Sequence, residues 1–237
     1  MKLAAVAPPV AVEPLHRILR LQATDPMAST TVRVYDEAVD RHVADSLSAL
    51  ALAPVRAAHR IADLGSGAGW PGLALAAALP GAHVSLVESA IRRCRYLERA
   101  VETSGLANVT VVHARAEEWR DGLGANDLVT ARALAALPVI LEYGAPLLSD
   151  GGHVIAWKGA VSPQEAADAS AAAAALGLVL AEVLAVTPYA GARDHTLHTY
   201  CKIAPTPARF PRRPGMATKR PLTGPDPVSR ETGTVPL

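Results

Sequence analysis

Apolar residues along this chain follow two different periods, and the two alternate. Short continuous apolar runs are typical of strands buried on both faces, whereas apolar residues recurring every three or four positions are typical of amphipathic helices. Residues 60–64 form the first such run, and residues 83–87 form the second. Helical spacing then follows from Ser89, a residue type that caps helices, to Gly105. The apolar side of that helix consists of Ala90, Cys94, Leu97 and Val101.

The same patterns predict seven strands in total. Helical sequence is expected at 70–79, between 130 and 148, and from 162 to about 176, where Ser162-Pro163-Gln164-Glu165 matches a capping box. Only an irregular stretch separates the last two strands, so we expect them to pair antiparallel at an edge. The predicted strands are 60–64, 83–87, 109–112, 127–130, 153–157, 179–186 and 198–203.

This alternation predicts an α/β fold with a mostly parallel seven-stranded sheet, an antiparallel edge and helices on both faces. Right-handed crossovers place the carboxyl ends of the parallel strands at one edge, where ligands bind. Ahead of the sheet we expect a loose end at 1–9 and helices at 14–21 and 36–52. The expected parts are an N-terminal helical extension (1–54), a central domain (55–204) and a Pro-rich basic tail (205–237), disordered after Leu222.

Composition narrows the class of protein. Half of the 237 residues are apolar, which excludes a wholly disordered chain. No apolar run reaches the ~18 residues that span a bilayer, and the N-terminus lacks the pattern of a signal peptide. Cys94 and Cys201 are too few for a disulfide framework or a zinc site. We therefore expect a cytoplasmic protein with no membrane contact and no bound metal.

Charge is nearly balanced overall but uneven along the chain. There are 23 Lys and Arg against 22 Asp and Glu, a formal net charge of +1. Residues 202–220 contain no acidic side chain, and this basic strip is typical of a surface that binds nucleic-acid phosphates. A merely solubilising tail is the alternative. The cations of the strip are Lys202, Arg209, Arg212, Arg213, Lys219 and Arg220.

The strongest local signal is the turn after the first strand, Asp63-Leu64-Gly65-Ser66-Gly67-Ala68-Gly69. Glycines at this spacing let the backbone adopt positive φ and approach a ligand closely. The dinucleotide pattern G-x-G-x-x-G fails because Trp70 occupies the place of its third glycine. Glu88, at the end of the next strand, can accept both hydroxyls of a ribose. The alternative is a Gly-rich turn without a ligand, followed by a helix-capping Glu88.

Asp63, the three glycines and Glu88 together resemble the cofactor site of class I S-adenosylmethionine (SAM) methyltransferases. Further segments resemble one branch, the GidB-type methyltransferases, which methylate guanine N7 in 16S rRNA. The resemblance covers roughly residues 35–221, and its segments occur in the family's order. They are 41–47 (RHVADSL), 63–72 (DLGSGAGWPG), 86–89 (LVES), 114–118 (ARAEE), 129–133 (VTARA), 157–159 (WKG) and the closing 211–222.

This resemblance implies a Rossmann-like fold, SAM as the cofactor and 16S rRNA or the small ribosomal subunit as the partner. Trp70 departs from the Phe or Leu of many members. The family's SAM contacts fall on Gly65, Trp70, Ala116, Glu117 and Arg132. The local signal adds Asp63, Ser66, Gly67, Gly69 and Glu88 to the expected cofactor site.

Guanine N7 carries a lone pair and no proton, so we expect no general base. Arg132 and Lys158 are instead expected to position the substrate. The alternatives are a surface ion pair for Arg132 and an exposed strand-end amine for Lys158. We also expect RNA contacts from His42 and Arg193, and from the basic strip between residues 209 and 220. A local helix contact with Asp45 is the alternative for His42.

Two other functions fit the same residues. One is a SAM-dependent methyltransferase with another substrate, which the basic strip and the ordered family segments disfavour. The other is a non-catalytic SAM- and RNA-binding assembly factor, which the intact glycine turn with Glu88 disfavours. In each case we expect the chain to be a monomer.

Overall fold

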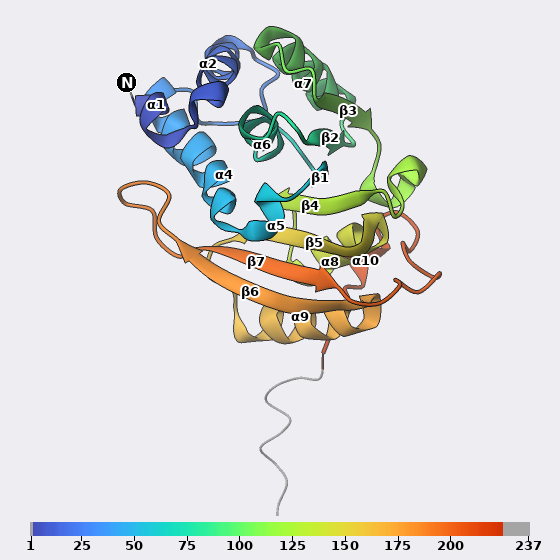
Figure 1. The fold of residues 1–237 in the computed structure, drawn as a ribbon. Coiled ribbons are helices and arrows are strands. Elements are labelled where there is room, and N and C mark those ends of the chain that lie inside the picture. The colour runs from blue at the N-terminus through green and yellow to red at the C-terminus, as the bar shows by residue number, and fades with distance from the viewer. Residues whose placement is uncertain (1, 225–237) are drawn as a thin grey trace, which may run out of the picture.

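Seven strands form one sheet at the centre of the molecule (Figure 1). A computed structural model describes residues 2–224, and most of the tail predicted to be disordered, from 225 on, lies outside these residues. The seven predicted strands are confirmed. They are β1 Arg60–Leu64, β2 His83–Glu88, β3 Val109–His113, β4 Asn126–Arg132, β5 Leu148–Lys158, β6 Leu178–Val186 and β7 His195–Lys202, in the sheet order β3-β2-β1-β4-β5-β7-β6.

The strand directions bring the carboxyl ends of five strands to one edge. β1 to β5 pair in parallel, whereas β7 runs antiparallel to both β5 and β6. The predicted antiparallel edge is therefore confirmed. Leu64 pairs with Val87, and Arg132 at the end of β4 pairs with Trp157 of β5. Residues that follow these strands, although far apart in sequence, therefore gather at one edge.

Helices cover both faces of this sheet. Within residues 2–224 they are α1 Lys2–Val6, α2 Pro9–Thr24, α3 Tyr35–Ala38, α4 Asp45–Leu47, α5 Ala53–Arg56, α6 Gly72–Ala78, α7 Ile91–Ser104, α8 Leu137–Gly144, α9 Pro163–Leu176 and α10 Met216–Lys219. Within the same residues, no helix combines the length and hydrophobicity that a bilayer crossing requires.

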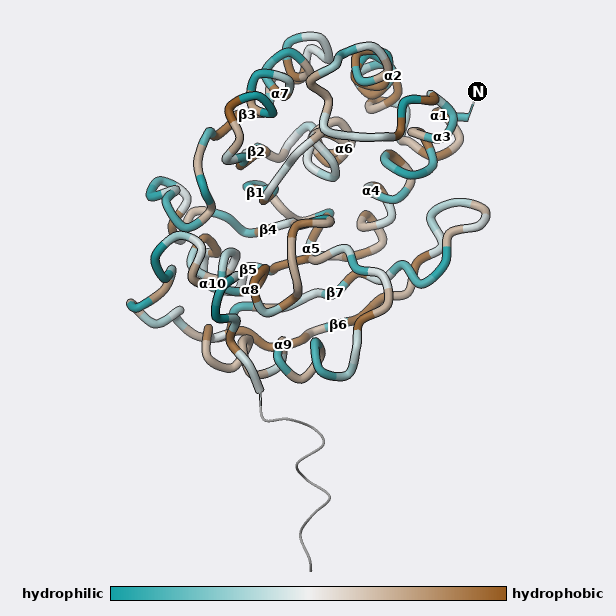
Figure 2. The backbone as a smooth tube through the Cα atoms, turned by 180° about the vertical axis from the view of Figure 1, so that it is seen from behind, coloured by the Kyte–Doolittle hydropathy of each residue, from teal (hydrophilic) through white to brown (hydrophobic). Residues whose placement is uncertain are grey.

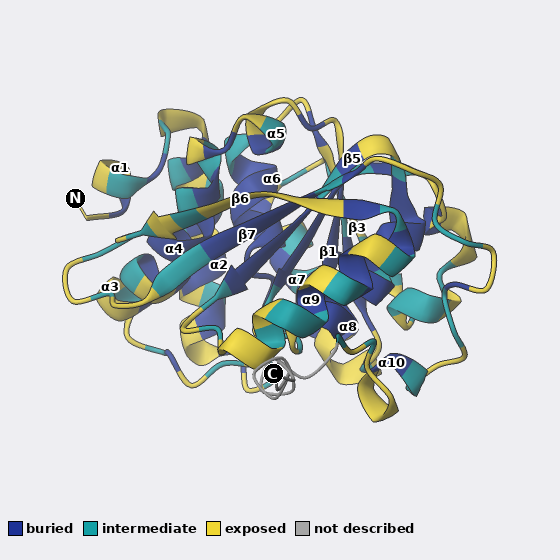
Figure 3. Ribbon diagram, turned by 90° about the horizontal axis from the view of Figure 1, so that it is seen from below, coloured by how far each residue is buried: buried dark blue, intermediate teal, exposed yellow. Residues whose placement is uncertain are grey.

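Each face of the sheet has its own apolar core. Successive strand residues point to opposite faces, so Ile61 belongs to the core shared with α2, α6 and α7, and Ala62 to the core shared with α8 and α9. Figure 2 shows hydrophobic and hydrophilic segments alternating along α7, as expected of an amphipathic helix. In Figure 3 the central strands are buried between the layers, whereas β6 is largely exposed.

The N-terminal region differs from the prediction. Residues expected to be loose form α1, because Leu3 and Ala7 are buried in the first core. α2 is longer than the predicted 14–21 and contributes Leu15 and Ile18 to the same core as Leu73 of α6. The boundary at residue 54 therefore does not separate two cores, and the three-part division stays a prediction.

The helix expected at 36–52 is not continuous. A π-helical turn, Val39–Ala44, and a 3-10 turn, Ser48–Ala51, interrupt it on either side of α4. The wider π turn changes which side chains face the sheet, and such turns are frequent at functional sites. His42 and Asp45 lie in this irregular segment, and both are buried.

Helix ends follow the sequence signals at three of four positions. Ser162 Oγ accepts a hydrogen bond from Glu165 N at 3.1 Å, which confirms the capping box. Gly105 and Gly177 end α7 and α9 in the left-handed conformation. The prediction that Ser89 caps α7 is wrong. Ala90 occupies that position, and its N–H donates to Glu88 Oε1 at 2.8 Å.

Candidate active site

The glycine turn after β1 has the close-packed backbone that its sequence predicts. Gly65, Gly67 and Gly69 have φ values of +64°, +57° and +94°. A Cβ on Gly65 would lie 2.5 Å from Leu134 Cδ1, so no larger residue fits without a shift of that leucine. Gly67 N donates to Glu88 Oε2 at 3.1 Å, and this bond ties the turn to the end of β2.

Two cavities meet at this turn. The first, about 130 Å³, has Gly65, Ala116, Glu117 and Tyr143 among its lining residues, and we call it the inner cavity. The second, about 310 Å³, we call the loop cavity. Gly65, Ser66, Gly67, Trp70 and Arg132 are among its lining residues. Predicted cofactor residues from several segments of the chain therefore surround one turn.

Two predicted cofactor carboxylates are buried behind the turn and line neither cavity. Asp63 Oδ1 accepts from Thr130 Oγ1 at 2.8 Å, and burial raises the pKa of Asp63 to about 6. Asp63 therefore supports the turn from behind, and its place in the cofactor site stays a prediction. Glu88 is 3% exposed, but it lies against Gly67 N–H and so borders the turn directly.

Trp70 forms the wall between the loop cavity and the N-terminal helices. Its ring stacks on His42, with centroids 5.6 Å apart and planes inclined by 11°. Its Nε1 donates to Gln22 Oε1 at 2.7 Å. Gln22 was not among the residues expected at the site, although a polar residue that follows Leu15, Ile18 and Leu19 on the apolar side of a helix is a usable signal.

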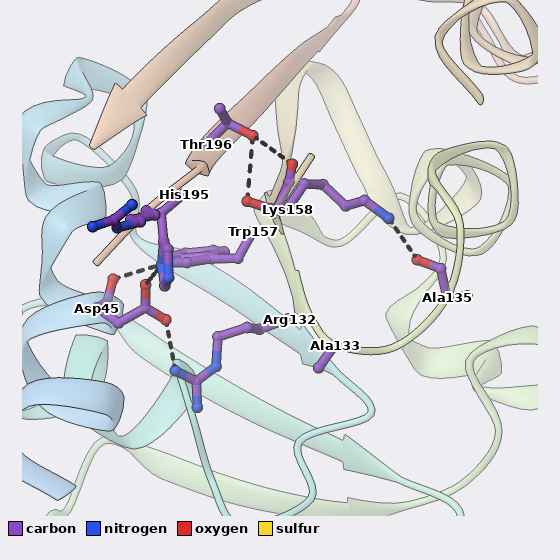
Figure 4. A pocket seen from close by; sticks show the side chains of 10 residues that line it. Asp45, Arg132, Ala133, Ala135, Trp157, Lys158, His195 and Thr196 are labelled. Carbon is purple, nitrogen blue, oxygen red and sulfur yellow. Dashed lines mark hydrogen bonds and ion pairs between the residues drawn. The ribbon is translucent and has the colours of Figure 1, made fainter. Parts of the chain in front are cut away.

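Arg132 belongs to a hydrogen-bond network that joins three parts of the chain, and Figure 4 shows its pair with Asp45 and the contact of Asp45 with His195. Its Nη1 donates to Asp45 Oδ2 at 2.7 Å, and its Nη2 contacts His42 Nδ1 at 3.1 Å. Asp45 Oδ1 in turn lies 2.9 Å from His195 Nδ1. The side chains of Arg132 and Asp45 are 16% and 7% exposed. His42 and Asp45, for which a local helix contact was the alternative prediction, are thus joined through Arg132.

A third cavity, also about 310 Å³, lies beside this network, and we call it the outer cavity. It shares Arg132 and Ala133 with the loop cavity. Arg193 lines it, and so does Lys158, whose Nζ lies 2.7 Å from Glu165 Oε1. Its remaining lining residues are Asp45, Ala135, Trp157, Gly159, His195 and Thr196. The two residues predicted to position a substrate, Arg132 and Lys158, therefore line one cavity.

His42 is neutral in this setting. The Arg132 guanidinium has no acceptor, so His42 Nδ1 accepts and its Nε2–H donates to Thr30 Oγ1 at 3.0 Å. Burial, together with the positive charge of Arg132, lowers the pKa of His42 to about 4. His42 is therefore part of the wall of the loop cavity and not a base that titrates near neutral pH.

A family model described as rRNA small subunit methyltransferase G, GidB, matches residues 23–193. The chain belongs to the GidB family. A relative from Rubrobacter xylanophilus named "Ribosomal RNA small subunit methyltransferase G" is 44% identical over 189 residues, which cover 77% of this chain and 72% of the relative. One of the same name from Roseiflexus castenholzii is 42% identical over 198 residues, 81% of this chain and 83% of that one.

Solved structures place this GidB-family chain in the class I SAM methyltransferase fold. A predicted O-methyltransferase from Agrobacterium tumefaciens matches with a TM-score of 0.53 and 25% identity, over 68% of this chain and 80% of that one. Fibrillarin from Aeropyrum pernix, solved with bound SAM, has a TM-score of 0.52 and 22% identity, over 66% and 72%. The chain is a SAM-dependent methyltransferase with the fold that the sequence predicted.

The residues around the glycine turn have the chemistry that this cofactor requires. Glu117 lines the inner cavity, and its carboxylate is a group that can accept from an adenine amine; Arg132 lines the loop cavity, and its guanidinium is a group that can pair with the carboxylate of the methionine end. Gly65 lies where the two cavities meet, and the Glu88 carboxylate lies just behind the turn. We expect Ala116 and Trp70 to supply apolar contacts on either side.

The basic strip divides into structural and exposed cations. The guanidinium of Arg212 is paired within the fold, since its Nε lies 2.6 Å from Glu142 Oε1, and its RNA contact stays a prediction. Lys202 Nζ donates to Leu148 O at 2.7 Å, and burial lowers its pKa. The guanidinium of Arg209 lies 4.9 Å from the centre of the Phe210 ring. The exposed cations of the strip are Arg209, Arg213, Lys219 and Arg220.

Proposed function

We propose that this methyltransferase transfers the methyl group of SAM to N7 of a specific guanine in 16S rRNA. One observation carries the proposal. The loop cavity, beside the glycine turn, and the outer cavity share the wall residues Arg132 and Ala133. The two cavities therefore adjoin at these residues, and a donor in the first cavity and a base in the second can meet there. The relatives' printed names support rRNA of the small subunit as the substrate.

The chemistry required of the chain is mainly positioning. Bound SAM supplies an electrophilic methyl group on a sulfonium, and guanine N7 offers a lone pair with no proton to remove. Holding the reacting atoms in line replaces a bimolecular encounter by an oriented one. Arg132, fixed by Asp45, and Lys158, fixed by Glu165, keep defined places at the outer cavity. Neutral His42 adds no positive charge beside the sulfonium.

RNA binding is assigned to cations at the rim of the outer cavity and on the strip. Arg193 lines the outer cavity, and Arg209, Arg213, Lys219 and Arg220 are exposed. Phosphate contacts of this kind supply affinity and orientation without reading sequence. An unpaired or extruded guanine is the form of the base that reaches such a cavity. We further propose that the protein is cytoplasmic and that it is a monomer. Sedimentation of the purified chain tests the monomeric state.

The decisive experiment locates the methyl group. Purified enzyme with methyl-tritiated SAM is expected to label 16S rRNA at one guanine. Methylation at N7 puts a positive charge on the imidazole ring, so borohydride followed by aniline should cleave the strand at that nucleotide alone. Label on an exocyclic amine or on C5, or label in 23S rRNA, would refute the proposal. Absence of any transfer despite SAM binding would favour a non-catalytic assembly factor.

A further inference from the structure

Part of the basic strip is docked against the wall of the inner cavity. Glu117 Oε1 accepts a hydrogen bond from Gly215 N at 3.0 Å. The hydroxyl of Tyr143 lies 3.1 Å from Thr218 Oγ1. Glu117 and Tyr143 both line the inner cavity. The same two side chains therefore contact the adenine end of the cofactor site on one side and the strip on the other.

A buried ion pair holds this part of the strip in place. Arg212 binds both carboxylate oxygens of Glu142, which belongs to α8 and is only 2% exposed in its side chain. Arg212 Nη2 also donates to Arg220 O at 2.8 Å, so one guanidinium fixes both ends of residues 212–220. Loss of one partner would leave a buried carboxylate without compensation, which is strongly destabilising. The ion pair therefore anchors the two ends of the segment, and between these ends Gly215 and Thr218 are held by their hydrogen bonds to Glu117 and Tyr143.

We propose that SAM binding and RNA binding are linked through residues 212–220, so that each ligand binds more tightly when the other is bound. This rests on the proposed function. Glu117 uses Oε1 for the strip, and its Oε2 makes no hydrogen bond within residues 2–224. An adenine amine and Gly215 N–H therefore bind the same carboxylate at the same time. Filling the cavity orders Glu117 and Tyr143, and with them the segment that carries Arg213, Lys219 and Arg220.

The sign of the linkage follows from this shared ordering. A ligand that binds after the segment is already ordered meets a smaller entropy cost, and the coupling is necessarily reciprocal. Coupling between two sites typically changes affinity by about 5- to 150-fold. The phosphate backbone of the RNA is the ligand on the strip side, because the segment's exposed side chains include three cations and no carboxylate.

The test compares the dissociation constant of 16S rRNA with and without saturating S-adenosylhomocysteine, at one salt concentration. We expect the wild-type protein to bind the RNA at least about fivefold more tightly with the cofactor product present. Thr218→Val and Tyr143→Phe each remove one partner of the same hydrogen bond and keep every cation. Each should reduce the coupling, and the double variant should reduce it no further. Thr223→Val, on an exposed threonine three residues beyond the segment, is the matched control.

The outcomes separate the linkage from the function. Equal RNA affinity with and without the cofactor product in the wild-type protein overturns the linkage, even where the N7 label appears as proposed. Wild-type coupling in both Thr218→Val and Tyr143→Phe overturns the route through the docked segment. A missing N7 label overturns the proposed function instead. Circular dichroism on each variant shows that a reduced coupling does not come from unfolding.

Discussion

Replacing Asp45 by asparagine tests the network around Arg132 most directly. The carboxylate accepts from Arg132 at 2.7 Å and lies 2.9 Å from His195 Nδ1. Asparagine fits the same space but has one acceptor oxygen and one donor amide. With its oxygen toward Arg132, its NH₂ faces His195 Nδ1, and the imidazole must then carry its proton on Nε2. Both hydrogen bonds can still form, but the negative charge that holds the Arg132 guanidinium in place is lost, so Arg132 shifts more easily.

The magnitudes follow from these contacts. A hydrogen bond to a charged group is worth about 1.5–3 kcal/mol net. Solvent reaches Arg132, whose side chain is 16% exposed, so the lost charge is partly compensated. We expect Asp45→Asn to lower the free energy of unfolding by about 2 kcal/mol. We expect kcat to fall by about 100-fold, because misplacing a reacting group by about 1 Å costs a factor of this order. The KM for SAM should rise as well, since Asp45 holds Arg132, which lines the loop cavity.

Urea unfolding and steady-state methyl transfer to 16S rRNA measure the two effects separately. Asp40→Asn is the matched control, because Asp40 lies in the same N-terminal segment and pairs with Lys2 at the surface. We expect that variant to keep its stability within about 0.5 kcal/mol and its kcat unchanged. A wild-type kcat in Asp45→Asn would refute the view that this network positions the reacting groups.

Three further predictions concern the cofactor, the RNA and pH. Gly67→Val should weaken SAM binding in calorimetry by tenfold or more, because its φ of +57° strains a non-glycine residue by about 1–2 kcal/mol and the side chain enters the loop cavity; an unchanged affinity would contradict the cofactor site. Reversing Arg213 and Arg220 to Glu should flatten the salt dependence of RNA binding by about one unit per lost phosphate contact, with SAM affinity unchanged; the same salt slope as wild type would mean that the strip binds no phosphate. The pKa of His42 is about 4 in the folded chain against 6.5 for the free side chain, so its neutral form stabilises the fold fully above pH 6.5 and this stabilisation is lost as pH falls toward 4. Between pH 6.5 and 4, the free energy of unfolding should therefore fall by up to about 3 kcal/mol less in His42→Gln than in the wild-type protein. The wild-type transfer rate should be flat from pH 6.5 to 8; a steep rate increase there would point to a titrating base.

The sequence pattern within each segment was sufficient to predict the strands and the glycine turn after β1. Burial on both faces leaves a continuous apolar run, so β1 and β2 were predictable from the residues within each. The positive φ values of Gly65, Gly67 and Gly69 are likewise a local requirement that glycine meets best. The irregular segment between α3 and α5 was not predictable in this way, because its π turn depends on packing against Trp70 and Arg132.

The partners of the charged residues were decided only by the tertiary structure. Asp45 meets Arg132 across 87 residues and His195 across 150, and Arg212 meets Glu142 across 70. From the sequence, Arg212 and Arg213 are equivalent neighbours in a basic strip. In the fold one is bound to a buried carboxylate and the other is exposed. Residue type and spacing thus determined the elements and the residues that carry chemistry, because those depend on short-range geometry. Which charges are paired and which are free to bind RNA depends on the burial of each partner, and that property exists only once the chain is packed.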